Sequence, residues 1–339
     1  MLRTFNEPAI NLSGKSILVT GGTGSFGRSF VRKILQDYDV RKIIVFSRDE
    51  YRQSLMMREF SGERQGVLRF FIGDVREADR LELAMREVDI VVHAAAMKHV
   101  TIAEYNPLEC IRTNVMGAEN VVKSALRSGV KKVIALSTDK AANPVNLYGA
   151  SKLASDKIFI AANALSGNLE TRFSVVRYGN VVGSRGSIVP IFEKMLQDGA
   201  TELPITDMRM TRFWITLEQG VAFVLSSLQM MQGGEIFVPK IPSMKVGDLV
   251  SAMAPHVKQN VIGIRPGEKL HEVMITEDDA RTTIVLNDRY VVQPAFEEHR
   301  RGKPISGDPV PDRFRYASDT NEEWADISTL REMLAAQRH

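Results

Sequence analysis

The stretch SILVTGGTGSFG, residues 16–27, decides the fold. Its first five residues form a short, continuous apolar run, which is typical of a strand buried on both faces of a parallel sheet. Gly21, Gly24 and Gly27 follow at once, before a segment with helical spacing. Glycines let a backbone turn tightly and approach a pyrophosphate, and a helix N-terminus adds free N–H groups. We therefore predict a dinucleotide-binding turn here, rather than only a tight turn.

Five further apolar runs repeat this pattern: KIIVF (42–46), LRFFI (68–72), DIVVHA (89–94), KKVIAL (131–136) and FSVVRY (173–178). Helical stretches such as residues 107–129, which end at Gly129, separate them. The alternation predicts an α/β fold with a doubly wound parallel sheet of the Rossmann type. After Tyr178 the rhythm loosens, with helices expected at 187–199, 217–231 and 326–337 and a strand at 234–239.

We divide the chain into two expected domains. Residues 12–178 plus about 213–242 form the dinucleotide-binding domain, and about 179–212 plus 243–339 form a smaller C-terminal α/β substrate domain. Composition agrees with a globular enzyme, since the 339 residues are 44% hydrophobic and 25% charged. A chain of this length buries a sizeable core without disulfides.

The net charge of +3 gives no indication of a nucleic-acid partner. Cys110 is the sole cysteine, which fits a reducing compartment. The N-terminus lacks an apolar signal core, and no apolar run reaches the roughly 18 residues of a membrane-spanning helix. We expect a soluble cytoplasmic protein with no membrane contact, and the six histidines show no spacing that predicts a metal site.

The residues after the second apolar run select the dinucleotide. A bare ribose 2′-hydroxyl usually meets an acidic acceptor there, whereas an arginine fork matches a 2′-phosphate. Ser47 and Arg48 follow the run, with Arg52 one helical turn further on, so we predict NADP rather than NAD. The alternative is that Arg48 only solvates the loop and Asp49 holds the ribose. The other expected cofactor contacts are Gly21, Thr23, Gly24, Ser25, Phe26, Gly27, Asp74, Val75, Ala94, Ala95, Ala96, Lys98, Tyr148 and Lys152.

STDKAANPVNLYGASK, residues 137–152, holds the candidate chemistry. Tyr148 and Lys152 are four apart and share one helix face. A neighbouring ammonium and a cationic nicotinamide lower the pKa of a phenol, which is near 10 when free, so that it takes a proton from an alcohol as hydride leaves carbon. Thr138 can hydrogen-bond the same oxygen. The pair Asp139–Lys140 exceeds what alcohol oxidation needs, and on its own it reads as a solvated pair that caps the loop.

TGGTGSFG, STDK and YGASK, in this order, resemble the extended short-chain dehydrogenases/reductases. Six longer strings are similar to one branch, the configuration-inverting UDP-N-acetylglucosamine 4,6-dehydratases, first enzymes of pseudaminic acid biosynthesis. They are AAAMKHVTIAEYNPLEC, STDKAANPVNLYGASK, RYGNVVGSRGS, MTRFWIT, GGEIFVPKIPSM and RPGEKLHEVM. The resemblance covers about residues 12–280 and is loose beyond them.

This resemblance implies a lyase that converts UDP-N-acetylglucosamine to UDP-2-acetamido-2,6-dideoxy-beta-L-arabino-hex-4-ulose. C4 is oxidised, water is eliminated across C5–C6, hydride returns to C6 and C5 is inverted, with tightly bound NADP recycled. It also implies that Lys140 is the C5 base and that Asp139 is the acid for the departing hydroxyl. The implied substrate contacts are Lys98, Asn180, Arg212, Arg265 and Glu268; without the resemblance, Lys98 and the two arginines would read as surface groups.

The assignment of Lys140 makes a demand on its pKa. A free lysine titrates near 10.4, so use of the neutral amine at pH 7 costs roughly 4.6 kcal/mol. We expect desolvation, Lys152 and the oxidised nicotinamide to lower the pKa of Lys140, beside a protonated Asp139.

Two other functions stay open. A retaining 4,6-dehydratase or a 5-epimerase of the same superfamily is one, although the retaining branch often has methionine where this chain has Tyr148. A non-catalytic NADP-binding regulator is the other, and the presence of Thr138, Asp139, Lys140, Tyr148 and Lys152 argues against it. Relatives form dimers to hexamers, so we expect a homo-oligomer. Whether the product feeds flagellin glycosylation or another glycan is not decided by the sequence.

Overall fold

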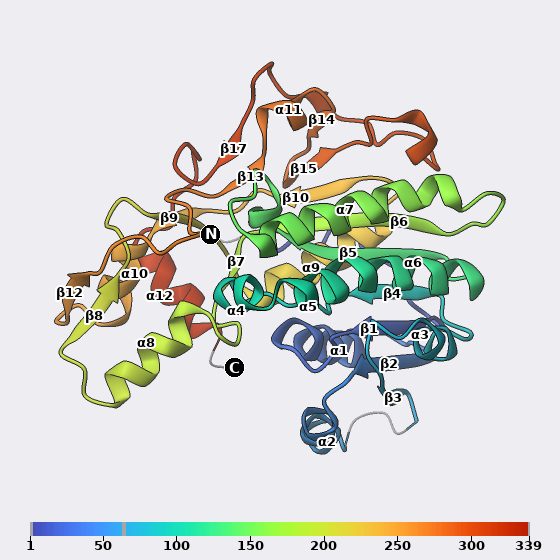
Figure 1. Cartoon of the computed structure of the whole chain (residues 1–339), viewed down its shortest axis with the longest axis horizontal. Coiled ribbons are helices and arrows are strands. Elements are labelled where there is room, and N and C mark those ends of the chain that lie inside the picture. The colour runs from blue at the N-terminus through green and yellow to red at the C-terminus, as the bar shows by residue number, and fades with distance from the viewer. Residues whose placement is uncertain (1–2, 63–65, 338–339) are drawn as a thin grey trace.

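A ten-stranded sheet forms the centre of the computed structural model, which describes residues 3–62 and 66–337 (Figure 1). Its order is β16-β14-β15-β10-β6-β5-β4-β1-β2-β3, and neighbouring strands from β10 to β3 are parallel. All six predicted runs are strands of it, which confirms the doubly wound fold. The parallel strands are β1 (Ser16–Thr20), β2 (Lys42–Ser47), β3 (Leu68–Ile72), β4 (Ile90–His93), β5 (Lys132–Thr138), β6 (Arg172–Tyr178) and β10 (Ile236–Pro239).

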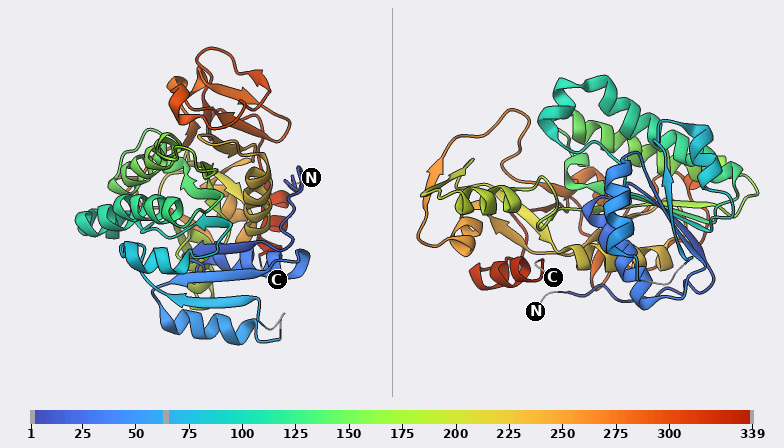
Figure 2. Two further views of the ribbon diagram at one scale, coloured as in Figure 1. Left: turned by 90° about the vertical axis from the view of Figure 1, so that its right-hand side faces the viewer. Right: turned by 90° about the horizontal axis from the view of Figure 1, so that it is seen from below.

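Helices cover both faces of this sheet (Figure 2). On one face α6 (Gly117–Arg127) packs between α3 (Ala78–Ala84) and α7 (Leu147–Leu165). On the other face α1 (Ser25–Asp37) packs against α9 (Leu217–Met230), and α2 (Glu50–Glu59) packs on β2 and β3. Apolar side chains of the sheet and both helical layers form the main core, so the strands are buried on two sides, as their continuous apolarity predicts.

The predicted helix at 107–129 is interrupted. It consists of α5 (Pro107–Ile111), a π-helical turn η1 (Arg112–Met116) and α6, and α4 (Val100–Tyr105) precedes it. The apolar spacing hides this irregularity because a π-turn adds only one residue to the helical path. Gly129, with φ +68°, follows the end of α6 in the left-handed conformation expected of a helix stop.

A smaller lobe follows β6 and lies on the left in Figure 1. It contains α8 (Ile188–Gln197), α10 (Val246–Met253) and α12 (Ile327–Ala335). Asp326 caps α12 by accepting a hydrogen bond from the Thr329 N–H at 2.7 Å. Short strands pair beside them, and two small apolar clusters fill the lobe. These strands are β7 (Asn180–Val181), β8 (Glu202–Ile205), β9 (Thr211–Ile215), β11 (Ser243–Lys245) and β12 (Lys258–Val261). β13 (Val273–Ile275) and β17 (Tyr316–Ala317) pair with each other outside this lobe, and side chains of both join the main core.

The large sheet extends further along the chain than the sequence analysis anticipated. β14 (Thr283–Val285), β15 (Arg289–Val292) and β16 (Asp308–Pro309) join its edge antiparallel, although they lie in the range assigned to the substrate domain. The domain division stays a prediction. None of the helices in residues 3–62 and 66–337 combines the length and apolarity that crossing a membrane requires.

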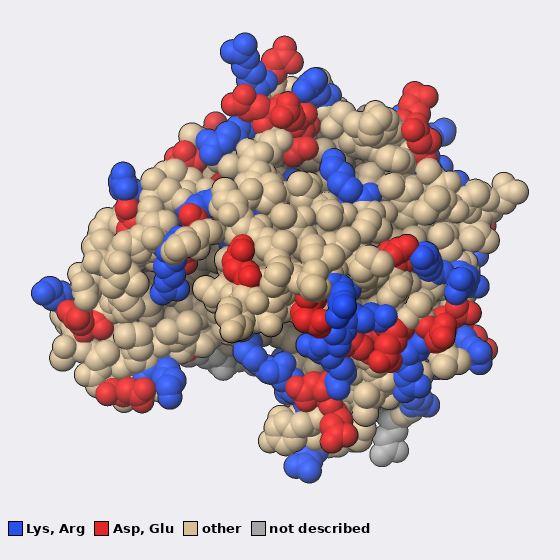
Figure 3. Space-filling view, in the orientation of Figure 1, with Lys and Arg blue, Asp and Glu red and all other residues tan. Residues whose placement is uncertain are grey.

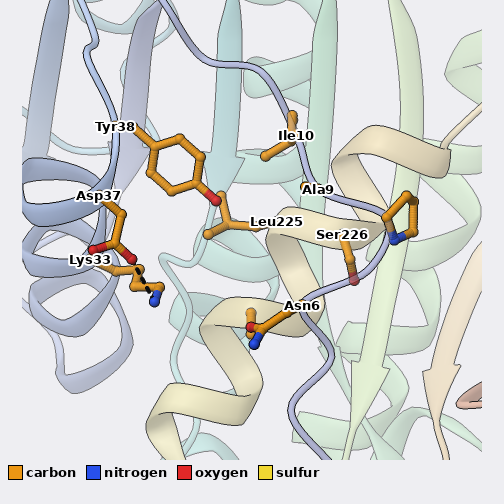
Figure 4. A pocket seen from close by; sticks show the side chains of 10 residues that line it. Asn6, Ala9, Ile10, Lys33, Asp37, Tyr38, Leu225 and Ser226 are labelled. Carbon is orange, nitrogen blue, oxygen red and sulfur yellow. Dashed lines mark ion pairs between the residues drawn. The ribbon is translucent and has the colours of Figure 1, made fainter.

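The N-terminal segment lies against α9. Phe5 packs edge-on against Phe223, and the Arg289 guanidinium donates a hydrogen bond to the Glu7 carbonyl at 3.2 Å. A small cavity of about 210 Å³ remains between this segment, α1 and α9 (Figure 4). Its charged side chains, Lys33 and Asp37, pair with each other. This cavity is therefore a gap beside a packed strap, apart from the cleft described next.

Candidate active site

The carboxyl ends of the parallel strands open into a cleft of about 1120 Å³. Residues that follow β1 to β6 line one side, and residues between positions 204 and 272 line the other. Parallel sheets bind ligands at this edge. Every predicted site residue lines the cleft except Asp139, which is fully buried next to it. The structure therefore brings together groups that are far apart in the sequence; their roles stay predictions.

The glycine-rich turn is fixed by close backbone packing. Gly21 has φ +65°, and a Cβ added there would lie 2.9 Å from the Ala95 backbone at the end of β4. A Cβ on Gly27 would lie 2.4 Å from the Cα of Gly22, so α1 can approach the turn only without a side chain there. Gly24 caps α1 without a side-chain hydrogen bond, and the first turn of α1 holds no acidic residue. The uncapped N–H groups of α1 fit an anionic diphosphate.

The polar residues beyond β2 form hydrogen bonds and ion pairs within the protein. The Ser47 hydroxyl accepts a hydrogen bond from Gln53 at 3.0 Å. Asp49 caps α2 by accepting from the Arg52 N–H at 2.9 Å, and it also pairs with the Arg52 guanidinium at 3.1 Å. Arg48 is exposed, and its nearest carboxylate is Asp74 at 3.4 Å. The alternative role for Asp49, holding a ribose, therefore competes with two existing contacts.

Asp74 is held as a carboxylate. Burial alone would raise its pKa, but hydrogen bonds from Arg76 and the charge of Arg48 hold the pKa below its ordinary value. The Arg76 guanidinium lies 2.8 Å from the Asp74 carboxylate. A charged acceptor therefore lies next to Val75 at the position expected beside the adenine.

Asn114 is a site-building residue that the sequence analysis missed. It lies in the π-turn η1, where its amide accepts from the Met97 N–H at 2.8 Å and donates to the Met97 carbonyl at 2.9 Å. The same amide donates to the Ser151 hydroxyl of α7 at 2.9 Å. Asn114 thus fixes the loop that follows Ala94, Ala95 and Ala96 against the catalytic helix. Its available signal was a buried polar residue inside an apolar helix pattern.

In residues 137–152, close packing at Gly149 sets the path of the backbone. β5 leads into the short 3₁₀ turn η2 (Asp139–Ala141), and α7 begins six residues after it. A Cβ on Gly149 would lie 2.2 Å from the Lys140 carbonyl oxygen, so only glycine lets the first turn of α7 pack on η2. Asn146 caps α7 by accepting from the Gly149 N–H at 2.8 Å and donates to the Gly267 carbonyl at 2.8 Å. This packing brings Tyr148 beside Lys140.

The Lys140 ammonium forms ion pairs with two carboxylates. Its ammonium lies 3.1 Å from Asp139 and 3.0 Å from Glu272, a residue the sequence analysis quoted but gave no role. Burial acts to lower the pKa of Lys140, but these two negative charges outweigh it and raise the pKa above its ordinary value. The expectation of a lowered pKa is therefore wrong here, because the charge of Asp139, which was expected to be protonated, raises the Lys140 pKa most and the unforeseen Glu272 adds to that effect. Burial and the charge of Glu272 raise the pKa of Asp139, as its expected role as acid requires.

The pKa of the Tyr148 phenol is raised in this structure, so the expectation that it is lowered overall is wrong here. Burial raises the pKa of Tyr148 to about 12, against the lowering effects of the Lys140 charge and a hydrogen bond with Thr138. Lys152 is buried and donates to the Leu136 carbonyl at 2.7 Å, and burial lowers its pKa. Lys140, rather than Lys152, is thus the cation that most lowers the Tyr148 pKa.

The expected substrate contacts lie on both walls of the cleft. Lys98 donates to the Arg185 carbonyl at 2.8 Å, which ties the loop after β4 to the loop after β7. Arg265 is exposed and lies 3.8 Å from Glu268. One buried oxygen each of Asn180 and Glu268 accepts no hydrogen bond within the described residues, which leaves both able to bind a polar ligand.

Arg212 uses its donors within the protein. Its two terminal nitrogens donate to the carbonyls of Thr211 at 2.7 Å, Lys269 at 3.0 Å and Leu270 at 3.1 Å. Its Nε lies 3.9 Å from Glu272. The substrate contact expected of Arg212 stays a prediction, and it requires some of these hydrogen bonds to be exchanged.

His93 takes part in packing and in a local hydrogen bond. His93 is buried in β4, where its Nδ1 lies 2.8 Å from the Thr20 hydroxyl and its ring lies 5.4 Å from that of Phe159. Burial lowers the pKa of His93 to about 3. Within residues 3–62 and 66–337, no three histidine, cysteine, aspartate or glutamate side chains are grouped so that they could hold a metal ion.

Residues 17–294 match the family described as "Polysaccharide biosynthesis protein". The chain belongs to this family. A curated member, the "UDP-N-acetylglucosamine 4,6-dehydratase (inverting)" of Campylobacter jejuni strain 81-176, is 55% identical over 329 residues. That match spans 95% of this chain and 98% of the relative. The family resemblance predicted from the sequence is confirmed.

Solved structures of similar proteins have the same fold as this chain. Pen from Bacillus thuringiensis is 35% identical to this member of the polysaccharide biosynthesis protein family, with a TM-score of 0.86 over 97% of this chain and 100% of Pen. DesIV, a dTDP-glucose 4,6-dehydratase from Streptomyces venezuelae solved with NAD and TYD bound, is 26% identical, with a TM-score of 0.63 over 75% of this chain and 86% of DesIV. The fold is therefore one that holds a nicotinamide dinucleotide in a relative.

Proposed function

We propose that this chain is an inverting UDP-N-acetylglucosamine 4,6-dehydratase, a lyase. The observation that carries the proposal is the group at the end of β5, where the buried Asp139 contacts Lys140, and Lys140 lines the cleft together with Tyr148. Oxidation of an alcohol needs one proton acceptor, whereas elimination of water also needs a base for carbon and an acid for the leaving oxygen. The name of the Campylobacter relative supports the same activity.

We propose NADP as the cofactor. The support is the exposed Arg48 at the end of β2 and the engagement of Asp49 in capping α2, although the DesIV structure was solved with NAD. When bound, the nicotinamide accepts a hydride from C4 and returns it to C6. The residues that would hold the dinucleotide are Gly21, Thr23, Gly24, Ser25, Phe26, Gly27, Ser47, Arg48, Arg52, Asp74, Val75, Ala94, Ala95, Ala96, Lys98, Tyr148 and Lys152.

Tyr148 removes the proton of the C4 hydroxyl in the first step. Burial raises the pKa of Tyr148 to about 12, and the Lys140 charge and a hydrogen bond with Thr138 act against that rise. A bound, cationic nicotinamide would lower the pKa further. The resulting C4 carbonyl acidifies the proton on the neighbouring C5 because the carbanion is stabilised as an enolate. In the proposal, Asn180, Arg265 and Glu268 hold the sugar nucleotide so that this carbon meets Lys140.

Lys140 and Asp139 then act as one unit. The neutral amine takes the C5 proton while the Asp139 carboxylic acid protonates the C6 hydroxyl, so that the C5–H and C6–O bonds break, a C5–C6 double bond forms and water departs. This leaves an ammonium beside a carboxylate, which is the pair that the structure shows at 3.1 Å. Transfer of one proton across that contact restores the reactive forms. Hydride return to C6 and addition of a solvent proton to C5 on the opposite face would complete the inversion, and the Tyr148 phenol would release to solvent the proton that it took from the C4 hydroxyl.

The wider setting follows from the proposed product, a nucleotide-linked 4-keto-6-deoxy sugar. We propose a cytoplasmic enzyme, working as a homo-oligomer of two to six chains, that carries out the first step of pseudaminic acid biosynthesis. The sequence resemblance supports this setting. Size measurement of the purified protein and identification of the glycan lost on gene deletion test it.

Incubation with UDP-N-acetylglucosamine in heavy water tests the reaction itself. We expect loss of one water by mass spectrometry, one deuterium at C5 and an inverted C5 centre by NMR. Retained C5 stereochemistry would assign the chain to the retaining dehydratases, and C5 inversion without loss of water would assign it to the 5-epimerases. An unchanged substrate with cofactor bound would support the regulator.

A further inference from the structure

Glu272 delivers a carboxylate to the catalytic lysine from a distant part of the chain. It immediately precedes β13 and is 1% exposed. Its backbone is clamped, since its N–H donates to the Ser318 hydroxyl at 2.9 Å and its carbonyl accepts from the Ser318 N–H at 2.8 Å. The carboxylate therefore meets Lys140 at 3.0 Å from a rigid support.

The charges around Lys140 leave Glu272 a distinct task. Asp139 and Glu272 are the two carboxylates that contact the ammonium, and Arg212 and Lys269 lie 3.9 Å and 3.7 Å from Glu272. Its second oxygen accepts no hydrogen bond within the described residues. Burial acts to raise the pKa of Glu272, but the charges of Lys140, then Arg212, then Lys269 hold it below its ordinary value, so Glu272 is charged beside them.

The elimination step needs Asp139 protonated and Lys140 neutral, which removes the ion pair between them. Glu272 then remains the charged contact of the amine. When the amine takes a proton from C5, the new ammonium forms beside a fixed negative charge that stabilises it. A solvated pair on a loop would need no second, buried carboxylate, and burying an extra charge is costly unless it has a use.

We propose that Glu272 is a positioning residue for the elimination step, which holds Lys140 toward C5 through both of its protonation states and stabilises the ammonium formed there. This inference rests on the proposed function. It assigns to RPGEKLHEVM a part in the chemistry, in addition to the sugar-nucleotide contacts expected of Arg265 and Glu268 in the same segment.

The pH profile distinguishes this role from a structural one. The titratable and charged groups around Lys140 are Asp139, Glu272, Arg212, Lys269 and the phenol of Tyr148. The Glu272 charge favours the protonated forms of both Asp139 and Lys140 and so raises the pKa of each. Removal of this charge must lower both pKa values, and both limbs of the kcat–pH profile must move to lower pH.

Glu272→Gln preserves shape and removes the charge. We expect kcat to fall about 10- to 100-fold, the range for losing a hydrogen bond to a charged group, with KM within about threefold and both limbs displaced to lower pH. Glu272→Asp keeps the charge on a shorter arm, so kcat falls while the limbs stay in place. Glu277→Gln, an exposed change in α11 (Glu277–Ala280), is the matched control and leaves both unchanged.

Three results would overturn the inference. They are unmoved limbs in a folded Glu272→Gln protein, an unchanged kcat in Glu272→Asp, or equal effects from Glu277→Gln. If the wild-type enzyme releases no water, the proposed function fails separately. NMR titration of lysine-labelled protein, assigned with Lys140→Met, then still reports whether Glu272→Gln lowers the Lys140 pKa, and an unshifted titration rejects the contact between the two residues.

Discussion

The two ends of the cleft present different chemical groups: backbone N–H groups at one end and ionisable side chains at the other. At the glycine-rich turn the working groups are backbone N–H groups, and the decisive residues are glycines whose missing side chains permit close packing. At the end of β5 the working groups are side chains, and Lys140 lies between two buried carboxylates. Binding a fixed diphosphate needs preformed geometry, whereas moving protons needs groups whose charges shift one another.

This difference decides which end the sequence reveals. Gly21, Gly24 and Gly27 act on neighbours within a few residues or on the adjacent strand, so their spacing alone predicted the turn. Tyr148 and Lys152 are likewise set by one helical turn. A proton-transfer site gathers charges from distant segments, and no local pattern records which carboxylate reaches which amine.

Replacement of the catalytic lysine separates the two ends most sharply. Lys140→Met removes the base and leaves the glycine turn intact, so we expect kcat to fall about 10²- to 10⁴-fold while cofactor stays bound. Lys157→Met, at an exposed position of α7, is the control. Turnover and cofactor content of the purified protein are the measurements. Full activity of Lys140→Met would remove the assigned base.

The opposite outcome is expected at the other end. Gly27→Ala places a methyl group 2.4 Å from the Gly22 Cα, so α1 must shift away from the turn. Overpacking of this kind costs about 1–3 kcal/mol, and the displaced N–H groups lose the diphosphate. We expect a lower Tm and a protein purified without cofactor.

A second glycine in a helix supplies the control for that experiment. Gly220 lies in α9, and an added Cβ there meets no atom within 4 Å. Alanine favours helices over glycine by roughly 1 kcal/mol, so Gly220→Ala should hold or raise the Tm and keep the cofactor. Equal behaviour of the two variants would show that close packing does not build the turn.

Sequence reasoning predicted most of the fold and most of the residues that line the cleft, but not the residues that hold them in place. It found the parallel strands because each is a continuous apolar run, and it missed the pairing of β14–β16 with the same sheet because short antiparallel edge strands carry little signal of their own. It missed Asn114 and Glu272 because each acts across the structure. The available signs were weak: a polar residue, Asn114, inside an apolar helix pattern, and a charged residue, Glu272, directly before the apolar strand β13.

Arg48 tests what side chains add to the backbone-built end. Arg48→Ala removes the exposed guanidinium expected to meet a 2′-phosphate, a charged hydrogen bond worth about 1.5–3 kcal/mol. We expect NADP affinity to fall about 10- to 100-fold with NAD affinity nearly unchanged, measured by calorimetry on cofactor-stripped protein. Arg281→Ala, which removes an exposed arginine paired with Asp278, is the control. A larger loss for NAD than for NADP would reverse the cofactor assignment.

Asp49→Ala carries the smallest expected effect and decides between the two readings of the same loop. Asp49 caps α2, and loss of such a cap costs about 1 kcal/mol. If capping is its whole task, the Tm falls slightly and the affinities for both dinucleotides keep their ratio. Asp326→Ala, which removes the corresponding cap of α12, should lower the Tm to a similar extent. A selective loss of NAD affinity in Asp49→Ala alone would instead place a ribose on this carboxylate. Cofactor binding would then depend on a charged side chain as well as on backbone N–H groups, as the chemistry proposed at the end of β5 does.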